Sequence, residues 1–258
     1  MIQTFLDKFM EQHWSDLLLL HWPVPQEVLR PTIPDALELD LFEGQAWASV
    51  VGFHLSGLRM RPVRWLSWGD FDEVNLRTYV KTADGKRGVW FHSLDSTDIF
   101  AVLGARILYG LAYRSAKIEK SLTDQTISYE STTHGIFGNI PAKLGAELKE
   151  SDGSFKVARE PLDQFLLERY RFWVRRKGGE KSSSAQIRHR PYNAVRLEKA
   201  NYEGGLFNAF GLPEPQDSPV VAHHCKGFSV EASAPQWLYK TAGHANQRLV
   251  NSPTLFIP

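Results

Sequence analysis

The hydrophobic pattern of this chain consists mainly of short apolar stretches separated by turn residues, which is typical of antiparallel β-structure. Residues 37–41 alternate apolar and charged side chains strictly, as expected of a strand with one face in water. The turn residues Glu43-Gly44 and Asp84-Gly85 each lie between two such stretches, which predicts two hairpins. The stretches expected to be strands are 17–20, 37–41, 45–53, 71–82, 89–91, 113–118, 122–131, 147–156, 170–174, 187–197 and 220–230.

Helical periodicity is confined to a few segments. The clearest is residues 99–110, where apolar residues fall on one helical face and Gly110 provides a C-terminal stop. Pro161 suits the first turn of another short helix. The remaining segments expected to be helical are 2–12, 26–30 and 202–210, and those expected to be loops are 57–69, 132–141 and 175–185.

Because strands outnumber helices and neighbouring strands are joined mainly by turns, we expect an α+β fold. It is mainly antiparallel β, built as a barrel or a strongly curved sheet. A length of 258 residues suits one domain over residues 1–258, with its core at about 14–232. The amphipathic segment 2–12 precedes this core, and the tail 236–258 has no strong pattern.

Composition narrows the function classes. The chain has 30 basic and 29 acidic side chains, so no overall field favours nucleic acid or an anionic membrane surface. The longest apolar run is much shorter than the ~20 residues of a membrane-spanning helix, and the N-terminus lacks a signal-peptide pattern. The single cysteine, Cys225, excludes an intramolecular disulfide framework. We therefore expect a cytoplasmic protein that binds neither nucleic acid nor membrane.

No known cofactor or nucleophile motif stands out. His223-His224-Cys225 is the only cluster of histidine and cysteine, and neighbouring strand residues point to opposite faces. Buried packing is therefore the favoured interpretation of these three residues, and we expect no metal site and no cofactor. Cys225 lacks any motif that would activate its thiol.

Acid–base and anion-binding groups remain. Glu73, Asn75 and Arg77 share one strand face, which suits either a grip on a polar ligand or a solvated surface. Ionisable groups beside apolar runs are candidates for a polar pocket, although structural ion pairs explain Glu168-Arg169 equally well. The candidate groups are Glu73, Arg77, His92, Tyr113, Arg114, Glu168, Arg169 and Arg171.

Several stretches together resemble the DUF2071, or YqjF-like, family. They are WSDLLLLHWPVP (14–25), LRPTIPDALELDL (29–41), EVNLRTYV (73–80), GVWFHSLD (88–95) and FLLERY (165–170). This family is grouped with acetoacetate decarboxylase-like proteins. The resemblance implies a barrel or cone-like antiparallel fold around a closed, largely apolar cavity.

The chemistry of the decarboxylases transfers less well than their fold. Their catalytic segment carries a Schiff-base lysine followed by a second lysine, and the similar run here places Tyr113 and Arg114 at those positions. A phenol cannot form an imine and an arginine stays protonated, so imine-based decarboxylation is not expected. Lys117 is the nearest lysine, and Glu73 matches an acid that the decarboxylases keep in the cavity.

The first hypothesis is therefore a small-molecule binding protein, or an enzyme without an imine intermediate, that acts on a carbonyl or carboxylate compound. In it Arg114 holds an anionic group, Tyr113 acts as hydrogen-bond donor or acid, and Glu73 acts as base or counter-charge. The other residues expected to bind substrate are Arg77, His92, Glu168 and Arg171. The alternatives are a ligand carrier or sensor without catalysis and a structural interaction protein; a homodimer through edge strands stays open.

Overall fold

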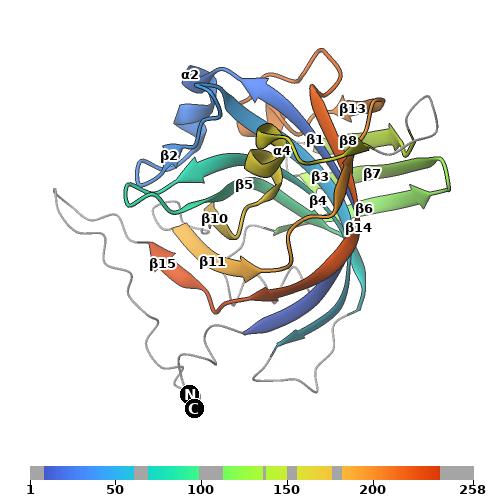
Figure 1. Ribbon diagram of the computed structural model, residues 1–258, viewed down its shortest axis with the longest axis horizontal. Coiled ribbons are helices and arrows are strands. Elements are labelled where there is room, and N and C mark those ends of the chain that lie inside the picture. Colours follow the sequence, from blue (N-terminus) through green and yellow to red (C-terminus); the bar gives the residue numbers. More distant parts are fainter. Residues whose placement is uncertain are drawn as a thin grey trace.

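A computed structural model describes residues 9–60, 69–98, 113–135, 138–149, 156–175 and 182–238, most of which lie in strands of one connected, strongly curved sheet (Figure 1). Its strands are β1 Met10–Val24, β2 Glu38–Leu39, β3 Ala46–Met60, β4 Phe71–Lys81, β5 Arg87–Ser96, β6 Tyr113–Leu122, β7 Thr126–Gly135, β8 Gly138–Glu147, β9 Lys156–Val157, β10 Arg171–Arg175, β11 Ser182–Arg188, β12 Ala194–Arg196, β13 Ala200–Gly204, β14 Val221–Ala232 and β15 Gln236–Leu238. The helical elements are α2 Gln26–Leu29, η1 Arg30–Thr32, α4 Pro161–Leu167 and η3 Asn208–Phe210.

The sheet is mixed but mainly antiparallel. Its main path runs β13-β8-β7-β6-β5-β10-β11-β14-β1-β3-β4-β2, and β4 also pairs with β5. Only the β5–β6 and β5–β10 pairings are parallel within the described chain. The expected class, mainly antiparallel β with a few short helices, is confirmed.

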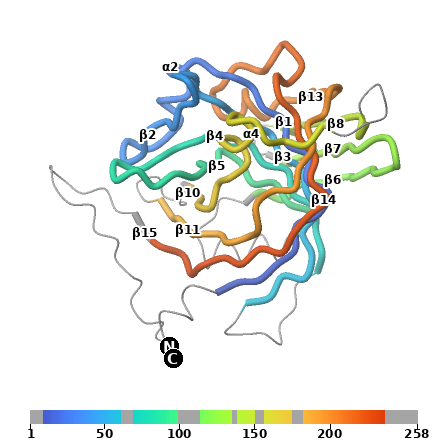
Figure 2. Tube along the Cα trace, in the orientation of Figure 1, coloured from blue at the N-terminus to red at the C-terminus, as the bar shows by residue number. Residues whose placement is uncertain are grey.

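Strands from opposite ends of the chain lie at the centre of this sheet. β1 pairs with β14 on one side and with β3 on the other, so the blue and red segments run side by side (Figure 2). A register shift in β1 falls at Asp16, whose φ of 55° lies in the left-handed region. The phenol of Tyr129 donates a hydrogen bond of 2.8 Å to the Asp16 carbonyl and so stabilises this bulge.

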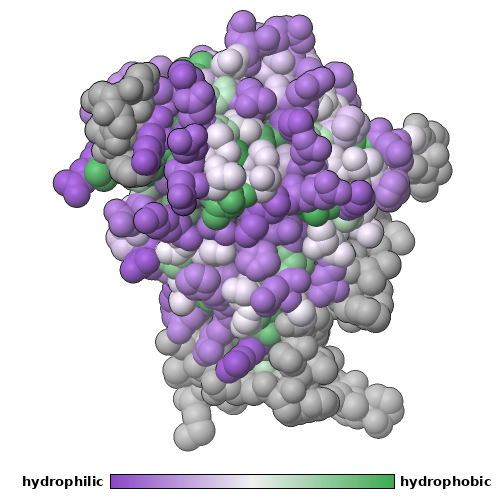
Figure 3. Space-filling view, turned by 90° about the vertical axis from the view of Figure 1, so that its right-hand side faces the viewer, coloured by the Kyte–Doolittle hydropathy of each residue, from purple (hydrophilic) through white to green (hydrophobic). Residues whose placement is uncertain are grey.

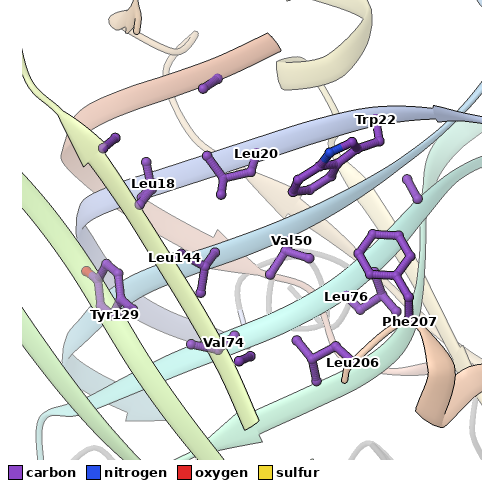
Figure 4. Close-up of a cluster of buried hydrophobic side chains, with 14 of the residues drawn as sticks. Leu18, Leu20, Trp22, Val50, Val74, Leu76, Tyr129, Leu144, Leu206 and Phe207 are labelled. Carbon is purple, nitrogen blue, oxygen red and sulfur yellow. The ribbon is translucent and has the colours of Figure 1, made fainter. Parts of the chain in front are cut away.

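The central strands have two buried faces, since their apolar residues form near-continuous runs. One face, here called the β7–β8 face, carries Leu18, Leu20, Val50, Val74 and Leu76. These side chains pack against a second layer that includes Tyr129 and Leu144 of β7 and β8 and Leu206 and Phe207 (Figure 4).

The opposite face is here called the α4 face, because α4 packs on it. Leu19 and Val51 on this face belong to the same apolar cluster as Leu167, and the Tyr79 ring contacts Phe165 in a second cluster. Pro161 occupies the first turn of α4, as the sequence predicts, and Glu160 and Asp163 form its capping box.

Several expected elements differ from those observed. Residues 37–41 shorten to β2, which pairs with β4 instead of forming a hairpin with β3. Asp40 follows β2, and its side chain forms a buried ion pair. The turn at Glu43-Gly44 is present, with positive φ at both residues. Within the segment 132–141, expected to be a loop, residues 132–135 and 138–141 are the paired ends of β7 and β8, where β-branched Thr132 and Thr133 favour a strand.

Other boundaries were also wrong. The segment 202–210 divides into the end of β13 and η3, because Tyr202 pairs with Leu144 of β8. The strand expected over 187–197 is interrupted at 189–193, between β11 and β12. Residues 10–12, expected to belong to a helix over 2–12, lie in β1. Residues 1–8 lie outside the described part, as do the expected helix 99–110 and the tail beyond 238.

Replacing Gly88 by alanine is expected to lower the free energy of unfolding by about 1–3 kcal/mol. A methyl group at this position would overlap the Arg171 carbonyl and the Trp173 ring, where β5 and β10 approach each other closely. Chemical denaturation of the variant measures the effect. Gly69→Ala is the matched control, because an added Cβ there meets nothing within 4 Å; equal stability of the two variants would contradict this packing.

Candidate functional site

A row of polar side chains crosses the α4 face of the central strands. His21 of β1 is opposite Ser49 of β3, and Ser49 is opposite Arg77 of β4. Directly opposed residues on neighbouring strands have Cβ atoms about 4.5–5.5 Å apart, so the three side chains are close neighbours. The strand register therefore places a guanidinium beside a buried hydroxyl and a buried imidazole.

Arg77 is the unusual member of this row. It is only 7% exposed, and its Nε and Nη2 atoms have no hydrogen-bond partner among the described residues. A buried charged donor without a partner is costly, and a bound anion is one kind of partner that would complete its hydrogen bonds. Arg77 thus offers two adjacent donors of the geometry that binds a carboxylate in a bidentate way.

Glu73 and Asn75 lie on the same face of β4 and are also buried. The Asn75 amide donates a hydrogen bond of 2.9 Å to Glu73 Oε1, while Asn75 Oδ1 has no partner in the described part of the chain. The interpretation of this strand face as a solvated surface is therefore wrong. The face instead presents an acid, an amide and a guanidinium to the protein interior.

A chain of buried hydrogen bonds starts at the inner end of the row. His21 Nδ1 lies 2.7 Å from Ser49 Oγ and 3.1 Å from the Tyr79 hydroxyl, and these two oxygens are 2.7 Å apart. On its other side, His21 Nε2 lies 3.0 Å from His223 Nδ1. All four residues have no exposed surface.

The chain continues to α4 and the surface. His223 Nε2 lies 2.8 Å from Asp163 Oδ1, which also accepts a hydrogen bond of 2.6 Å from Arg196 Nε. Asp163 Oδ2 accepts the backbone N–H of Glu160. The Arg196 side chain is one-quarter exposed, so it connects this buried chain with solvent.

The electrostatics assign protons along the chain. Burial acts to raise the pKa of Asp163, but hydrogen bonds from His223 and Arg196 outweigh it and hold this pKa below its ordinary value. Burial, His223 and Arg77 hold the pKa of His21 well below its ordinary value, and burial lowers that of His223. Both imidazoles are then neutral: His223 Nε2–H donates to the carboxylate and His21 Nε2–H donates to His223.

Acidification is expected to destabilise the protein through these histidines. Their folded-state pKa values lie below the unfolded value of 6.5, so the unfolded chain binds more protons once the pH falls below about 6.5. The free energy of unfolding should then fall by up to about 1.4 kcal/mol per pH unit for each histidine. Urea unfolding between pH 7.5 and 5.0 measures the slope, which His223→Gln should reduce and His13→Gln, at an exposed position, should leave unchanged. Equal slopes in both variants would contradict this account.

An aromatic cluster lies beside the row. The His189 ring stacks on Phe228 at 4.6 Å and contacts Tyr170 and Tyr192, at centroid distances of 4.7 and 5.2 Å. His189 Nδ1 lies 2.7 Å from the Arg190 carbonyl, and its Nε2 has no partner among the described residues. Burial lowers the pKa of His189, and the Arg77 charge acts in the same direction.

Glu168 belongs to this cluster as well. One oxygen accepts the Tyr170 hydroxyl and the other accepts the Tyr192 backbone N–H at 2.9 Å. Burial and the Glu168 hydrogen bond raise the pKa of Tyr170 to about 12. Glu168 thus joins α4 to the segment before β12, near the candidate groups of β4.

Arg114 and His92 lie elsewhere, next to η3. The Arg114 guanidinium makes a bidentate pair with Asp95, at 2.6 and 2.7 Å, and lies 5.1 Å from the Phe210 ring centroid. The His92 ring is 6.2 Å from the same Phe210 ring. Asp95 has no exposed surface, and burial raises its pKa. This cluster borders the β7–β8 face and not the α4 face.

The remaining predicted residues are not brought to the row either. The Arg171 guanidinium donates to Gln236 at 3.2 Å and lies 5.9 Å from the Trp173 ring centroid, outside the α4 face. Tyr113 begins β6, and its backbone is in register with Leu94, which is opposite Asn75; its side chain lies outside the described part. Lys117, in contrast, is 74% exposed and pairs with Glu119 at 2.6 Å.

A separate groove of about 500 Å³ lies between β7, β8 and the segments around 198–201 and 218–222. Both lysines that line it form ion pairs, Lys143 with Glu130 and Lys199 with Glu147. Hydrophilic side chains cover most of this side of the molecule (Figure 3). The cations of this groove are therefore already compensated, in contrast to Arg77.

The described residues offer neither a metal site nor a membrane-spanning helix. Among the described residues, no group of three or more His, Cys, Asp or Glu side chains is placed to hold a metal ion. Within the same part of the chain, every helix is too short or too polar to cross a membrane.

Comparison with known proteins places the chain in a family. The model of DUF2071, described as an uncharacterized conserved protein, matches residues 11–229. The chain belongs to the DUF2071 family. It is also 34% identical over 218 residues to "Uncharacterized protein YqjF" of Bacillus subtilis (strain 168), covering 84% of this chain and 87% of that protein. The resemblance seen in the sequence is confirmed.

Solved structures support the fold expected of a DUF2071 protein. Enduracididine biosynthesis enzyme MppR complexed with pyruvate matches with a TM-score of 0.60 at 11% identity, covering 87% of this chain and 88% of that one. Acetoacetate decarboxylase from Legionella pneumophila matches with a TM-score of 0.57 at 12% identity, covering 88% and 87%. At such low identity these similarities show that the fold is acetoacetate decarboxylase-like and carry no chemistry to this chain.

The chain of buried hydrogen bonds was missed in the sequence. His21 closes the apolar run 17–20 and His223 lies in the run 220–225, so each was a polar residue in an otherwise apolar stretch. That signal indicates a buried polar residue that needs a partner. It does not identify the partner, which depends on the pairing of β1 with β14.

Proposed function

We propose that this DUF2071 protein binds a small carboxylate compound, of the class of 2-oxo acids, on the α4 face of its curved sheet. The observation that carries the proposal is Arg77, a buried guanidinium with two donors and no partner for them among the described residues. A carboxylate bound there would compensate the buried charge and satisfy both donors.

The surroundings of Arg77 suit such a ligand. Asn75 and Glu73 lie next along the same face and offer an amide and an acid for a second polar group. Apolar residues flank the row, Val51 and Phe53 among them, and would cover a short carbon chain. One solved structure of similar fold is described as complexed with pyruvate, and pyruvate is therefore the first probe.

If the protein is an enzyme, we propose that its reaction forms no imine intermediate. Glu73 is the proposed base or counter-charge, and Tyr113, at the start of β6, is the proposed acid. A carrier or sensor that binds the same carboxylate without turnover is the second candidate. It is favoured by the burial of Glu73 together with its hydrogen bond from Asn75, which reduces the freedom of this acid to take a proton.

Calorimetric titration with pyruvate and a panel of other short carboxylates tests the proposal. Binding is expected in the unmodified protein and should weaken at least tenfold in Arg77→Gln, since a charge-assisted bidentate pair is lost. Arg114→Gln and Arg171→Gln are the matched controls, because each removes a guanidinium that already has a partner. If Arg77→Gln still binds the carboxylate and Arg114→Gln does not, the carboxylate is bound by Arg114. This result would contradict the role of Arg77.

A further inference from the structure

The cluster of His21, Ser49 and Tyr79 is a closed triangle of polar atoms. The three distances between His21 Nδ1, Ser49 Oγ and the Tyr79 oxygen are 2.7, 3.1 and 2.7 Å, so every pair is within hydrogen-bond reach. With His21 neutral, Nδ1 is an acceptor and the triangle holds only the two hydroxyl hydrogens. Both can be used inside it: one hydroxyl donates to the other, and the second donates to the imidazole.

Protonation of His21 changes this arrangement. The added hydrogen sits on Nδ1, which then donates and no longer accepts. One hydroxyl can still donate to the other, but no acceptor inside the triangle remains for the last hydroxyl hydrogen. Either Ser49 or Tyr79 must then donate its hydrogen to an atom outside the triangle, because an unmade bond at a buried donor is costly.

Arg77 marks where that outside acceptor would lie. Ser49 is directly opposite Arg77 across the β3–β4 pair, and Tyr79 is two residues further along the same face of β4. A carboxylate held by Arg77 would have its oxygens beside these hydroxyls. It would also offset the positive charge of Arg77, which in the empty site opposes a second cation at His21.

We propose that carboxylate binding at Arg77 is coupled to uptake of one proton by His21, with the freed hydroxyl of Ser49 or Tyr79 donating to the bound carboxylate. This inference rests on the proposed function and adds its regulation: the protein takes up the anion together with a proton. Affinity for the carboxylate then rises as the pH falls from neutral.

The other charged groups around the triangle are compatible with this coupling. His223 accepts a hydrogen bond from His21 Nε2 whether His21 is neutral or protonated. His223 in turn donates to Asp163, whose charge is compensated by Arg196. The Arg169 guanidinium lies 5.1 Å from the Tyr79 ring centroid but is paired with Asp40. The Arg77 charge also acts on His189, so this histidine is the necessary control.

The test has two arms, of which the first needs no ligand. Imidazole resonances of His21 are followed by NMR from pH 4.5 to 8 in Arg77→Gln and in Arg77→Lys, which keeps the charge. The pKa of His21 should be at least about one unit higher in Arg77→Gln, as for removal of a neighbouring cation. Equal values in the two variants would overturn the coupling.

The second arm measures proton uptake during pyruvate binding, by calorimetry at pH 6 in two buffers with different ionisation enthalpies. A net uptake is expected in the unmodified protein and in His189→Gln, and its loss is expected in His21→Gln. Binding without uptake, or uptake lost in His189→Gln, would contradict the role of His21. Absence of pyruvate binding would instead contradict the anion site, and the NMR arm would still decide whether the two groups are coupled.

Discussion

Replacing Asp40 by asparagine is expected to lower the free energy of unfolding by about 3–5 kcal/mol, the cost of leaving one partner of a buried ion pair alone. Asp40 is 2% exposed, and its Oδ2 accepts a hydrogen bond of 2.5 Å from Arg169 Nη1. The Arg169 side chain is itself 3% exposed, so water cannot replace the carboxylate.

Arg169 has other contacts, but none of them carries a negative charge. Its Nε donates to the Phe165 carbonyl at 2.7 Å, and its guanidinium lies 4.2 Å from the Phe165 ring centroid. Burial already lowers the pKa of Arg169 against the opposing effect of Asp40. Without Asp40, the exposed Arg87 nearby would add repulsion and no compensation.

Urea denaturation measures the Asp40→Asn effect. Asp35→Asn is the matched control, because Asp35 pairs with Arg30 at the surface and should change stability by less than about 0.5 kcal/mol. The double variant Asp40→Leu with Arg169→Met should recover most of the loss, since it removes both charges. A loss below about 1 kcal/mol in Asp40→Asn would show that the pair is not buried in solution.

Replacing Arg77 by methionine is expected to have the opposite effect on stability and to raise the free energy of unfolding by roughly 1–3 kcal/mol. Arg77 resembles Arg169 in burial but not in pairing: Arg169 has a carboxylate, whereas two donors of Arg77 have no partner among the described residues. Methionine fills similar space and leaves no buried charge. The gain in stability should accompany the loss of carboxylate binding.

Arg169→Met is the matched comparison for this prediction, because Arg169 is also buried but has a carboxylate partner. Thermal and urea unfolding of the two single variants should show Arg77→Met above the unmodified protein and Arg169→Met well below it. If both variants are destabilised to a similar extent, Arg77 has a structural partner and is not kept for a ligand.

The sequence predicted the local elements that depend on local chemistry. The turn at Asp84-Gly85 joins β4 and β5, with Gly85 at φ 82°. The shared face of Glu73 and Arg77 also followed from the period of a strand. Whether that face was wet or buried did not follow, because it depends on the strands and on α4 that cover it.

The site residues that were missed are separated by large distances along the chain. His21 meets His223 across 202 positions, and His223 meets Asp163 across 60. These contacts are set by the register of β1 on β14 and by the placement of α4, which no local pattern encodes. Arg114 shows the same limit: its sequence position suggested an anchor for an anion, and its pairing with Asp95 came from the β5–β6 register.

The most direct test of the account is a crystal structure of the protein grown with pyruvate. The account predicts the ligand on the α4 face of the sheet, with its carboxylate within 3.2 Å of Nε and Nη2 of Arg77, the ordinary range of such hydrogen bonds. Pyruvate bound at Arg114 or in the groove beside β7 and β8, or an Arg77 paired with a protein carboxylate, would contradict it.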